Sequence, residues 1–334
     1  MPASPEPRPL IDGLGRRIDY VRLSVTDRCD LRCRYCMPER MQFLPRRDLL
    51  ELHELAALAD ILIARGVRRI RLTGGEPLVR PGVIDLVRTI GARVGSGLDE
   101  LTLTTNGTRL AGHADALAAA GVRRINVSLD SLVPERFRAV TRGGDVKQVL
   151  AGIGAARTAG LRVKINMVAL AGVNQDEFAA MLLWCGEFGF DLSLIETMPL
   201  GEVEDDRTAY FLPLAQARAA IEARFTLVPT TYRTGGPSRY FEVAETGTRV
   251  GFITPLTDNF CAGCNRIRIT ATGTLYPCLG HSNAVELRDL LRAGGETAVD
   301  AALDTILAGK PPRHDFDIAA PMPAVPRHMS ITGG

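Results

Sequence analysis

A repeated unit of helix, glycine and short apolar run constrains the fold of this chain more than any other feature. The unit recurs over residues 64–73, 97–105, 120–130, 159–168 and 188–196. In each copy a glycine can end the helix in a left-handed turn, and a strand-like run follows at once, which predicts βαβ units around a parallel sheet. With an earlier apolar run at 20–25 we count six strands. Because a closed TIM barrel needs eight strands, we expect an α/β fold with an open, six-stranded (β/α)6 partial barrel.

The repetition stops after Gly201, so the rest of the 334 residues is predicted to be an addition to the barrel. In that part we expect a helix near 214–224, short strands near 239–243 and 249–253, and helices near 285–292 and 298–307. The predicted divisions are a flexible, proline-rich arm at 1–16, the barrel at 17–212, a C-terminal α+β extension covering the barrel mouth at 213–325, and a tail at 326–334 that ends in Gly-Gly.

Composition argues against several functional classes. Hydrophobic residues make up 46% of the chain and no long apolar run occurs, so we expect a soluble protein with no membrane span. A net charge of +2 gives no reason to expect nucleic-acid binding. The first ten residues hold four prolines and lack the apolar segment of a signal peptide, so we expect a cytoplasmic protein. Seven cysteines without a secretion signal disfavour a disulfide scaffold, and their grouping favours metal.

The first cysteine group comprises Cys29, Cys33 and Cys36, spaced C-x3-C-x2-C directly after the first predicted strand. Three thiolates in one tight loop can hold three irons of a [4Fe–4S] cluster and leave the fourth iron open to a small molecule. A zinc knuckle is the alternative, because C-x2-C occurs at both kinds of metal site.

The second group comprises Cys261, Cys264 and Cys278, and its spacing leaves the metal open. His281 could complete a Cys3His zinc site. Arg266 and Arg268 favour another interpretation, because two cations at period two share one face of a strand and suit a bound polyphosphate. The seventh cysteine, Cys185, is expected to be an ordinary buried core thiol.

Polar residues follow the predicted strands at 73–77, 104–107, 128–130, 164–166 and 196–198. In parallel α/β folds the carboxyl ends of the strands form the active-site face, so the first cysteine loop belongs to the same mouth. Lys164 interrupts an apolar run, and a buried lysine without an anion would be costly. The alternative for Lys164 is the solvent face of an edge strand.

Together these motifs resemble the radical SAM enzymes and, among them, the GTP 3′,8-cyclase family, also called molybdenum cofactor biosynthesis protein A. The matches run in order from about residue 14 to the C-terminus. They are D-x-x-R-L-S-V-T-D-R-C, R-x-T-G-G-E-P-L, T-T-N-G, R-I-N-V-S-L-D, F-C-x-x-C-x-R-x-R and the terminal Gly-Gly.

The resemblance implies two [4Fe–4S] clusters, S-adenosylmethionine (SAM) as co-substrate and GTP as substrate. A 5′-deoxyadenosyl radical would take hydrogen from C3′ of GTP, which then closes onto C8 in the first step of molybdenum cofactor biosynthesis. By the same resemblance SAM would contact Tyr35, Gly75, Ser128 and Met198. GTP would contact Arg22, Arg71, Thr104, Lys164, Arg266 and Arg268. The tail residues Gly333 and Gly334 would reach the active site.

Further partners implied by the resemblance are a flavodoxin- or ferredoxin-like electron donor, a downstream cyclic pyranopterin monophosphate synthase and a second copy of the chain in a homodimer. The chain departs from the family pattern at Ser193, where arginine is frequent, and at Thr332, where an aliphatic residue is usual. Two alternatives remain: another two-cluster radical SAM enzyme such as a peptide maturase, and a zinc-stabilised binding module.

Overall fold

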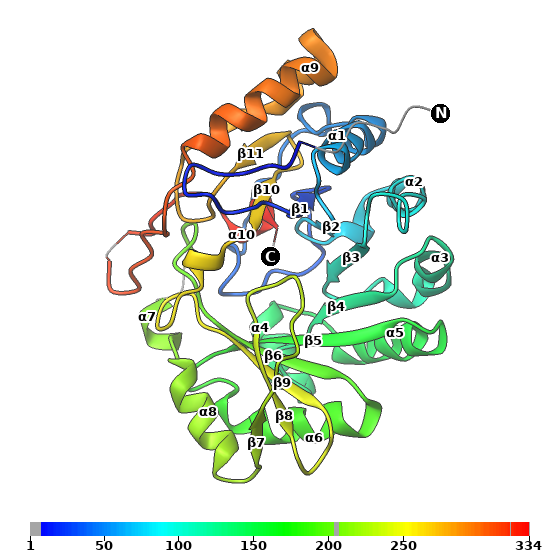
Figure 1. Cartoon of the computed structure of the whole chain (residues 1–334). Helices are drawn as coiled ribbons and strands as arrows, with labels where there is room; N and C mark the ends of the chain where they lie inside the picture. Colours follow the sequence, from blue (N-terminus) through cyan, green and yellow to red (C-terminus); the bar gives the residue numbers. More distant parts are fainter. Residues whose placement is uncertain (1–7, 204–206, 321, 334) are drawn as a thin grey trace.

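The computed structural model describes residues 8–203, 207–320 and 322–333, and in these residues twelve strands form one sheet. Its centre is the expected run of six parallel strands, each hydrogen-bonded to the next in chain order (Figure 1). These strands are β1 (Tyr20–Ser24), β2 (Arg69–Thr73), β3 (Glu100–Thr105), β4 (Arg124–Ser128), β5 (Arg162–Ala169) and β6 (Asp191–Glu196). The partial barrel predicted from the glycine repeat is therefore confirmed.

The C-terminal region lengthens this sheet at both edges, which the sequence pattern did not predict. On one edge β10 (Arg266–Ile269) pairs parallel with β1, and antiparallel β11 (Thr274–Tyr276) and β12 (Val285–Glu286) follow. On the other edge β9 (Arg249–Ile253) pairs parallel with β6, and antiparallel β8 (Arg239–Val243) and β7 (Leu227–Pro229) follow. The expected extension is thus continuous with the barrel wall, and the division at residue 212 stays a prediction.

The helices of the repeat line the outer side of the barrel (Figure 1). The helices in the described residues are α1 (Leu52–Ala64), α2 (Val83–Gly91), α3 (Ala114–Ala119), α4 (Pro134–Thr141), α5 (Val146–Thr158), α6 (Phe178–Phe188), α7 (Arg207–Tyr210), α8 (Leu214–Glu222), α9 (Leu287–Ala308) and α10 (Met329–Thr332). Short 3-10 helices occur at Arg46–Asp48, Pro77–Val79, Leu110–Gly112, Gln175–Glu177 and Cys261–Gly263. Two helices were expected where α9 lies, and Gly295 breaks α9 between them with φ 61° and ψ −151°.

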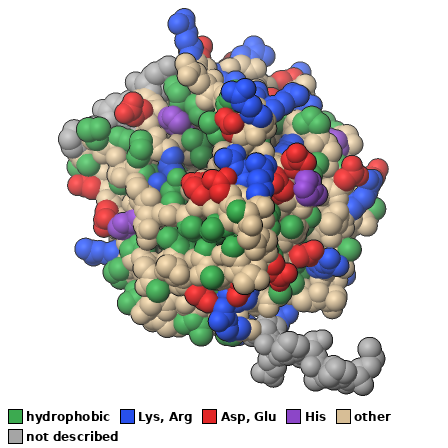
Figure 2. All heavy atoms as spheres, turned by 90° about the horizontal axis from the view of Figure 1, so that it is seen from above, with side chains coloured by type: hydrophobic (Ala, Val, Ile, Leu, Met, Phe, Trp, Pro, Cys, Tyr) green, Lys and Arg blue, Asp and Glu red, His purple; other side chains and the backbone are tan. Residues whose placement is uncertain are grey.

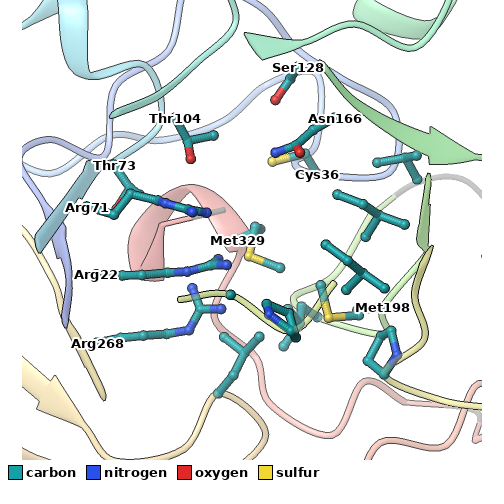
Figure 3. A pocket seen from close by; sticks show the side chains of 18 of the residues that line it. Arg22, Cys36, Arg71, Thr73, Thr104, Ser128, Asn166, Met198, Arg268 and Met329 are labelled. Carbon is teal, nitrogen blue, oxygen red and sulfur yellow. The ribbon is translucent and has the colours of Figure 1, made fainter. Parts of the chain in front are cut away.

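Apolar and charged residues alternate along the strands, so that one face packs in the core and the other lines the barrel interior. In β1, Val21 and Leu23 are fully buried in the hydrophobic core, whereas Arg22 between them points into the barrel (Figure 3). In β2, Ile70 and Leu72 repeat the apolar face, and Arg71 repeats the inward charge. Because successive side chains of a strand point to opposite faces, the same strands supply both the core and the cavity wall.

The two ends of the described chain are both held against the barrel. The flexible arm was predicted at 1–16, of which residues 1–7 lie outside the described residues, and its flexibility stays a prediction. In the described part, Arg8 donates hydrogen bonds to Asp300 and Asp304 of α9 at 3.0 and 2.6 Å. At the other end α10 lies inside the barrel, beside β1 and β10 (Figure 1). Within the described residues we find no helix that is long and apolar enough to span a membrane. On the face seen in Figure 2, basic and acidic side chains are interspersed.

Candidate active site

One cavity inside the barrel collects the predicted site residues. Its lining includes both cysteine groups and every predicted SAM and GTP contact: Cys29, Cys33, Cys36, Cys261, Cys264, Cys278, Tyr35, Gly75, Ser128, Met198, Arg22, Arg71, Thr104, Lys164, Arg266 and Arg268. From the tail, Met329 and Ser330 line the cavity, Gly333 does not, and Gly334 lies outside the described residues. The individual roles stay predictions, but the fold brings these distant segments into one space.

Three arginines stand side by side on neighbouring strands of the cavity wall. Strand register aligns Arg22 of β1 with Arg268 of β10 on one side and with Arg71 of β2 on the other. Side chains in register on parallel strands share a face, and the three guanidinium groups form a row in the cavity (Figure 3). We call these three residues the arginine ladder.

The arginine ladder is buried without counter-ions. Arg22, Arg71 and Arg268 are 8%, 6% and 6% exposed, and none of them forms a salt bridge within the described residues. Burial, aided by the charge of Arg71, lowers the pKa of Arg22 to about 9. Like charges held together out of water are costly unless an anion joins them. Guanidinium groups suit phosphate oxygens, so the ladder has the chemistry of a polyphosphate site.

Lys164 extends the positive wall from β5. Its side chain is 5% exposed, and its Nζ donates a hydrogen bond of 2.6 Å to the Tyr240 hydroxyl. Burial is the main cause that lowers the pKa of Lys164. Because β5 lies between β4 and β6, the edge-strand alternative for this lysine is excluded. Thr104 of β3 also lines the cavity, and its Oγ1 has no hydrogen-bond partner in the described residues.

The two cysteine groups lie at opposite ends of the strands. Cys29 to Cys36 follow the carboxyl end of β1, whereas Cys264 precedes the amino end of β10. Since β1 and β10 are parallel neighbours, one group flanks each end of the barrel. The arginine ladder lies between them, halfway along the same two strands.

The first cysteine loop fits a cluster with three protein ligands. The Cys29 Sγ accepts from the Leu31 N–H at 3.4 Å and from Asn106 Nδ2 at 3.7 Å, and such bonds stabilise metal-bound thiolates. Burial raises the pKa of Cys29 to about 12. Burial also raises the pKa of Cys33 well above its usual range. Thiols in such surroundings lose their protons when a metal binds them, so the donor set fits an iron–sulfur cluster.

The stretch Thr73–Pro77 is locked against this loop by its backbone. The Gly75 N–H donates to Thr26 O at 2.9 Å, and a Cβ on Gly75 would collide with Arg28 O. Only glycine therefore lets the two segments approach so closely. Glu76 does not line the cavity, and it accepts hydrogen bonds from Asn106 N at 2.6 Å and from Thr105 Oγ1 at 2.8 Å. Burial raises the pKa of Glu76 to about 7.

His281, which could complete a Cys3His zinc site with the second cysteine group, is engaged elsewhere, and the metal held by this group stays a prediction. The His281 Nε2 lies 2.8 Å from Arg313 O, its Nδ1 lies 3.4 Å from Asp315, and its side chain does not line the cavity. Burial opposes ionisation of Cys264, but the charges of Lys310 and Arg266 outweigh it and lower its pKa. The surroundings therefore favour a thiolate ligand.

Asp130 and Glu196 belong to the polar strand ends expected from the sequence, but their supporting roles were not predicted. Asp130 accepts from the Tyr35 hydroxyl at 2.7 Å and from Val168 N at 2.8 Å, which holds the first cysteine loop in place. Glu196 was expected at the active-site mouth, where it accepts from Leu256 N at 3.0 Å and ties the extension to β6. A polar residue directly after a strand was the available signal, but it does not distinguish a tether from a ligand contact.

The two departures from the family pattern are both buried. Ser193 shares a hydrogen bond of 3.0 Å with Ser238, so no cation occupies its position. Thr332 is fully buried in α10, and its Oγ1 has no hydrogen-bond partner among the described residues. Neither residue contacts a grouped cysteine through a hydrogen bond recorded in the described chain.

Comparisons with known proteins agree with this geometry. The Radical SAM superfamily model matches residues 23–185, and the model named Molybdenum Cofactor Synthesis C matches residues 190–316. A GTP 3′,8-cyclase from Erythrobacter litoralis (strain HTCC2594) is 61% identical over 327 residues, which cover 97% of this chain and 98% of that protein. The chain belongs to the GTP 3′,8-cyclase family. A family member from Rhizobium etli (strain CIAT 652) is 55% identical over 336 residues, covering 100% of this chain and 97% of its own length.

Solved structures support the fold at low sequence identity. Streptococcus suis SuiB bound to S-adenosylmethionine aligns with a TM-score of 0.60 and 16% identity, over 86% of this chain and 68% of that chain. Native anSMEcpe with bound AdoMet aligns with a TM-score of 0.54 and 14% identity, over 83% of this chain and 82% of that chain. Family membership confirms the expectation of a radical SAM enzyme that uses SAM and an iron–sulfur cluster, while the number of clusters stays a prediction.

Proposed function

We propose that the chain converts GTP to (8S)-3′,8-cyclo-7,8-dihydroguanosine 5′-triphosphate, the first step of molybdenum cofactor biosynthesis. The observation that carries this proposal is the arginine ladder, a buried set of cations that have no carboxylate partner among the described residues and lie between two cysteine groups in one cavity. A triphosphate supplies the negative charge that this wall lacks. Relatives that match the chain over nearly its full length bear the name of this activity.

At the carboxyl end of the barrel, Cys29, Cys33 and Cys36 would hold the first cluster. When bound, a [4Fe–4S] cluster with an open iron supplies the electron that cleaves SAM to a 5′-deoxyadenosyl radical. Gly75 and Ser128 stand at the ends of β2 and β4, where the backbone and a hydroxyl can bind the polar groups of SAM. Tyr35 and Met198 would contact the adenine.

Deeper in the barrel, the arginine ladder, Lys164 and Thr104 would hold the triphosphate of GTP. Arg266 lies one row nearer the second cysteine group, where Cys261, Cys264 and Cys278 would hold a second cluster against the guanine. Held at the triphosphate and at the guanine by these two groups of residues, GTP would have its ribose positioned for the reaction with SAM. Such positioning lowers the barrier because the reacting atoms are brought together before the reaction begins.

The enzyme also needs an electron donor, and its product needs an enzyme that uses it. We infer two clusters per chain, a flavodoxin- or ferredoxin-like electron donor, and a downstream cyclic pyranopterin monophosphate synthase that takes the product. We also infer that the protein forms a homodimer and acts in the cytoplasm. These inferences rest on family membership.

The decisive experiment follows hydrogen from GTP to SAM. Anaerobically reconstituted, reduced protein is incubated with SAM and GTP that carries deuterium at C3′, and both products are analysed by mass spectrometry. We expect deuterium in 5′-deoxyadenosine and a cyclised nucleotide of altered retention time. The matched control replaces GTP by ATP. Formation of unlabelled 5′-deoxyadenosine beside unchanged GTP would contradict the proposal and point to another substrate, such as a peptide.

A further inference from the structure

Lys310 is a buried lysine beside the second cysteine group. It follows the C-terminal end of α9 and is 4% exposed. Its Nζ donates a hydrogen bond to Arg266 O at 3.1 Å and another to Pro277 O. Arg266 is two residues beyond Cys264, and Pro277 directly precedes Cys278. One ammonium group therefore joins the two backbone segments that carry these cysteines.

The backbone around Lys310 is held on both sides. The Lys310 N–H donates to Leu307 O at 3.0 Å, which continues the end of α9. Arg16 donates hydrogen bonds to Pro311 O at 2.7 Å and to Cys261 O at 2.8 Å. It therefore links the segment after Lys310 to Cys261, the remaining cysteine of the second group. The backbone on both sides of Lys310 is thus hydrogen-bonded, and its ammonium group lies on the buried side, against the two cysteine segments.

The charge of Lys310 has no carboxylate partner within the described residues. Its two hydrogen bonds go to carbonyl oxygens, whose dipoles offset only part of the cost of burying an ammonium ion. A [4Fe–4S] core bound by three thiolates carries a net negative charge. The ligand that would balance Lys310 is thus a cluster held by the adjacent cysteines.

We propose that Lys310 is a positioning residue for the second cluster, which joins the Cys264 and Cys278 segments and balances the negative charge of their thiolates. This inference rests on the proposed function for the presence of that cluster. Since reduction adds an electron, a fixed positive charge beside the cluster favours its reduced state and raises its reduction potential. Outer groups of this kind also slow the loss of metal.

The test compares Lys310→Met, which keeps the side-chain length and removes the charge, with Lys310→Arg, which keeps the charge. Lys147→Met, at an exposed position of α5, is the control. Each protein is reconstituted anaerobically, its iron is counted, and its clusters are titrated by EPR-monitored reduction. A variant with alanine at Cys29, Cys33 and Cys36 identifies the signal of the second cluster. Release of iron to a chelator is timed in parallel.

We expect Lys310→Met to shift the potential of the second cluster to a more negative value and to release that iron about ten-fold faster. Lys310→Arg and Lys147→Met should match the wild type, and the first-cluster signal should not move. Unchanged potential and release rate in a folded Lys310→Met protein would overturn the inference. So would equal losses in the Met and Arg variants with a lowered Tm, because packing and not charge would then explain them.

The outcomes also separate this inference from the proposed function. A wild-type protein that binds only one cluster contradicts the two-cluster proposal, and the inference falls with it. A two-cluster wild type whose potential is insensitive to Lys310→Met contradicts the inference alone. If Lys310→Met does not fold, Lys310→Gln, which is neutral but can still donate to a carbonyl, is judged by the same two measurements.

Discussion

Arg266 begins β10, and its guanidinium lies 5.3 Å from the centre of the Phe260 ring and 6.0 Å from that of Tyr20. Its Nε has no hydrogen-bond partner in the described residues although it is buried. A cation held between two rings without a counter-ion is positioned for an incoming anion. We therefore predict that Arg266 contributes more to substrate binding than to the stability of the fold.

Arg266→Ala should weaken GTP binding about thirty-fold, which corresponds to about 2 kcal/mol for a lost charge-assisted contact. SAM cleavage in the absence of GTP should persist, because Arg266 lies at the far end of the barrel from the first cysteine group. Equilibrium binding and 5′-deoxyadenosine production measure the two effects. The exposed Arg224→Ala is the control. Loss of iron on Arg266→Ala would mark the residue as structural.

Lys164 should make GTP binding depend on pH. Its pKa is lowered in the free protein by burial first and by Arg71 and Arg124 as well. A bound triphosphate favours the charged form of Lys164 and raises its pKa, so GTP binding takes up protons. The affinity for GTP therefore falls as the pH rises above the lowered pKa that Lys164 has in the free protein. Calorimetry over a pH series that extends up to the pKa of a free lysine, about 10.4, in buffers of different ionisation enthalpy, measures the proton uptake. Lys164→Arg should bind GTP without proton uptake, and equal proton uptake in the variant and the wild type would contradict the prediction.

Arg22→Met should stabilise the GTP-free protein while it removes GTP binding. Arg22 is the middle member of the arginine ladder and is flanked by like charges on both sides. Removing it relieves repulsion and the cost of burying a charge, which we expect to raise Tm by about 2 °C. Thermal scans in phosphate-free buffer measure the change, with Arg224→Met as control. A lowered Tm would show that Arg22 contributes more to packing than to repulsion.

Among the elements, α10 shows how a short helix depends on its surroundings. Its four residues are too few to be helical alone, but Ser330 and Thr332 are buried inside the barrel. Arg268 of the arginine ladder donates to Thr332 O at 3.2 Å and also to Gly333 O. Gly333 has φ 77°, and a Cβ there would collide with Thr73 Oγ1. The tail thus occupies a place that only glycine fits.

Deleting Gly333 and Gly334 should leave both clusters intact and impair turnover. Arg268 then loses a carbonyl partner, so its guanidinium is held less firmly where the triphosphate would bind. Iron content and the UV–visible spectrum should match the wild type, whereas kcat for nucleotide conversion should fall at least about ten-fold. A deletion of residues 2–6 at the other end of the sequence tests whether any truncation has this effect. Full activity without the two glycines would refute a role for the tail in catalysis.

At the scale of the whole molecule, strand pairing brings together cysteine groups that are far apart in the chain. The first cysteine group comes from the start of the chain and the second from its last quarter, yet β10 pairs with β1 and places them on one cavity. If both groups hold clusters, reconstituted protein should bind about eight irons per chain. The barrel then separates two metal centres with the arginine ladder between them.

Alanine at Cys261, Cys264 and Cys278 should reduce iron to about four per chain and abolish GTP binding. SAM binding and uncoupled SAM cleavage should remain, because the first group lies at the opposite end of the strands. Iron analysis and parallel binding measurements check both statements. Cys185→Ala, at the buried thiol of α6, is the matched control. Zinc in the second group of the wild type, with four irons in total, would contradict this prediction.

Local sequence patterns were sufficient to predict the six central strands and the first cysteine loop. The glycine repeat predicted six strands in order, because each helix end and strand start is encoded within a few residues. The spacing of Cys29, Cys33 and Cys36 predicted a cluster loop for the same reason. Family resemblance added the roles of residues such as Arg22 and Ser128, which spacing alone does not reveal.

Other features depended on contacts between segments far apart in the chain. No local pattern states that β10 pairs with β1 or that β9 pairs with β6, and so the sheet was expected to end at six strands. The arginine ladder follows from the register of three strands, and the contact of Lys310 with Pro277 joins residues that are 33 positions apart in the chain. The sequence by itself determined the repeating units and the cluster-binding loop, because their information is local. The tertiary structure decided which charges meet in the cavity, because strand pairing and burial act between distant residues.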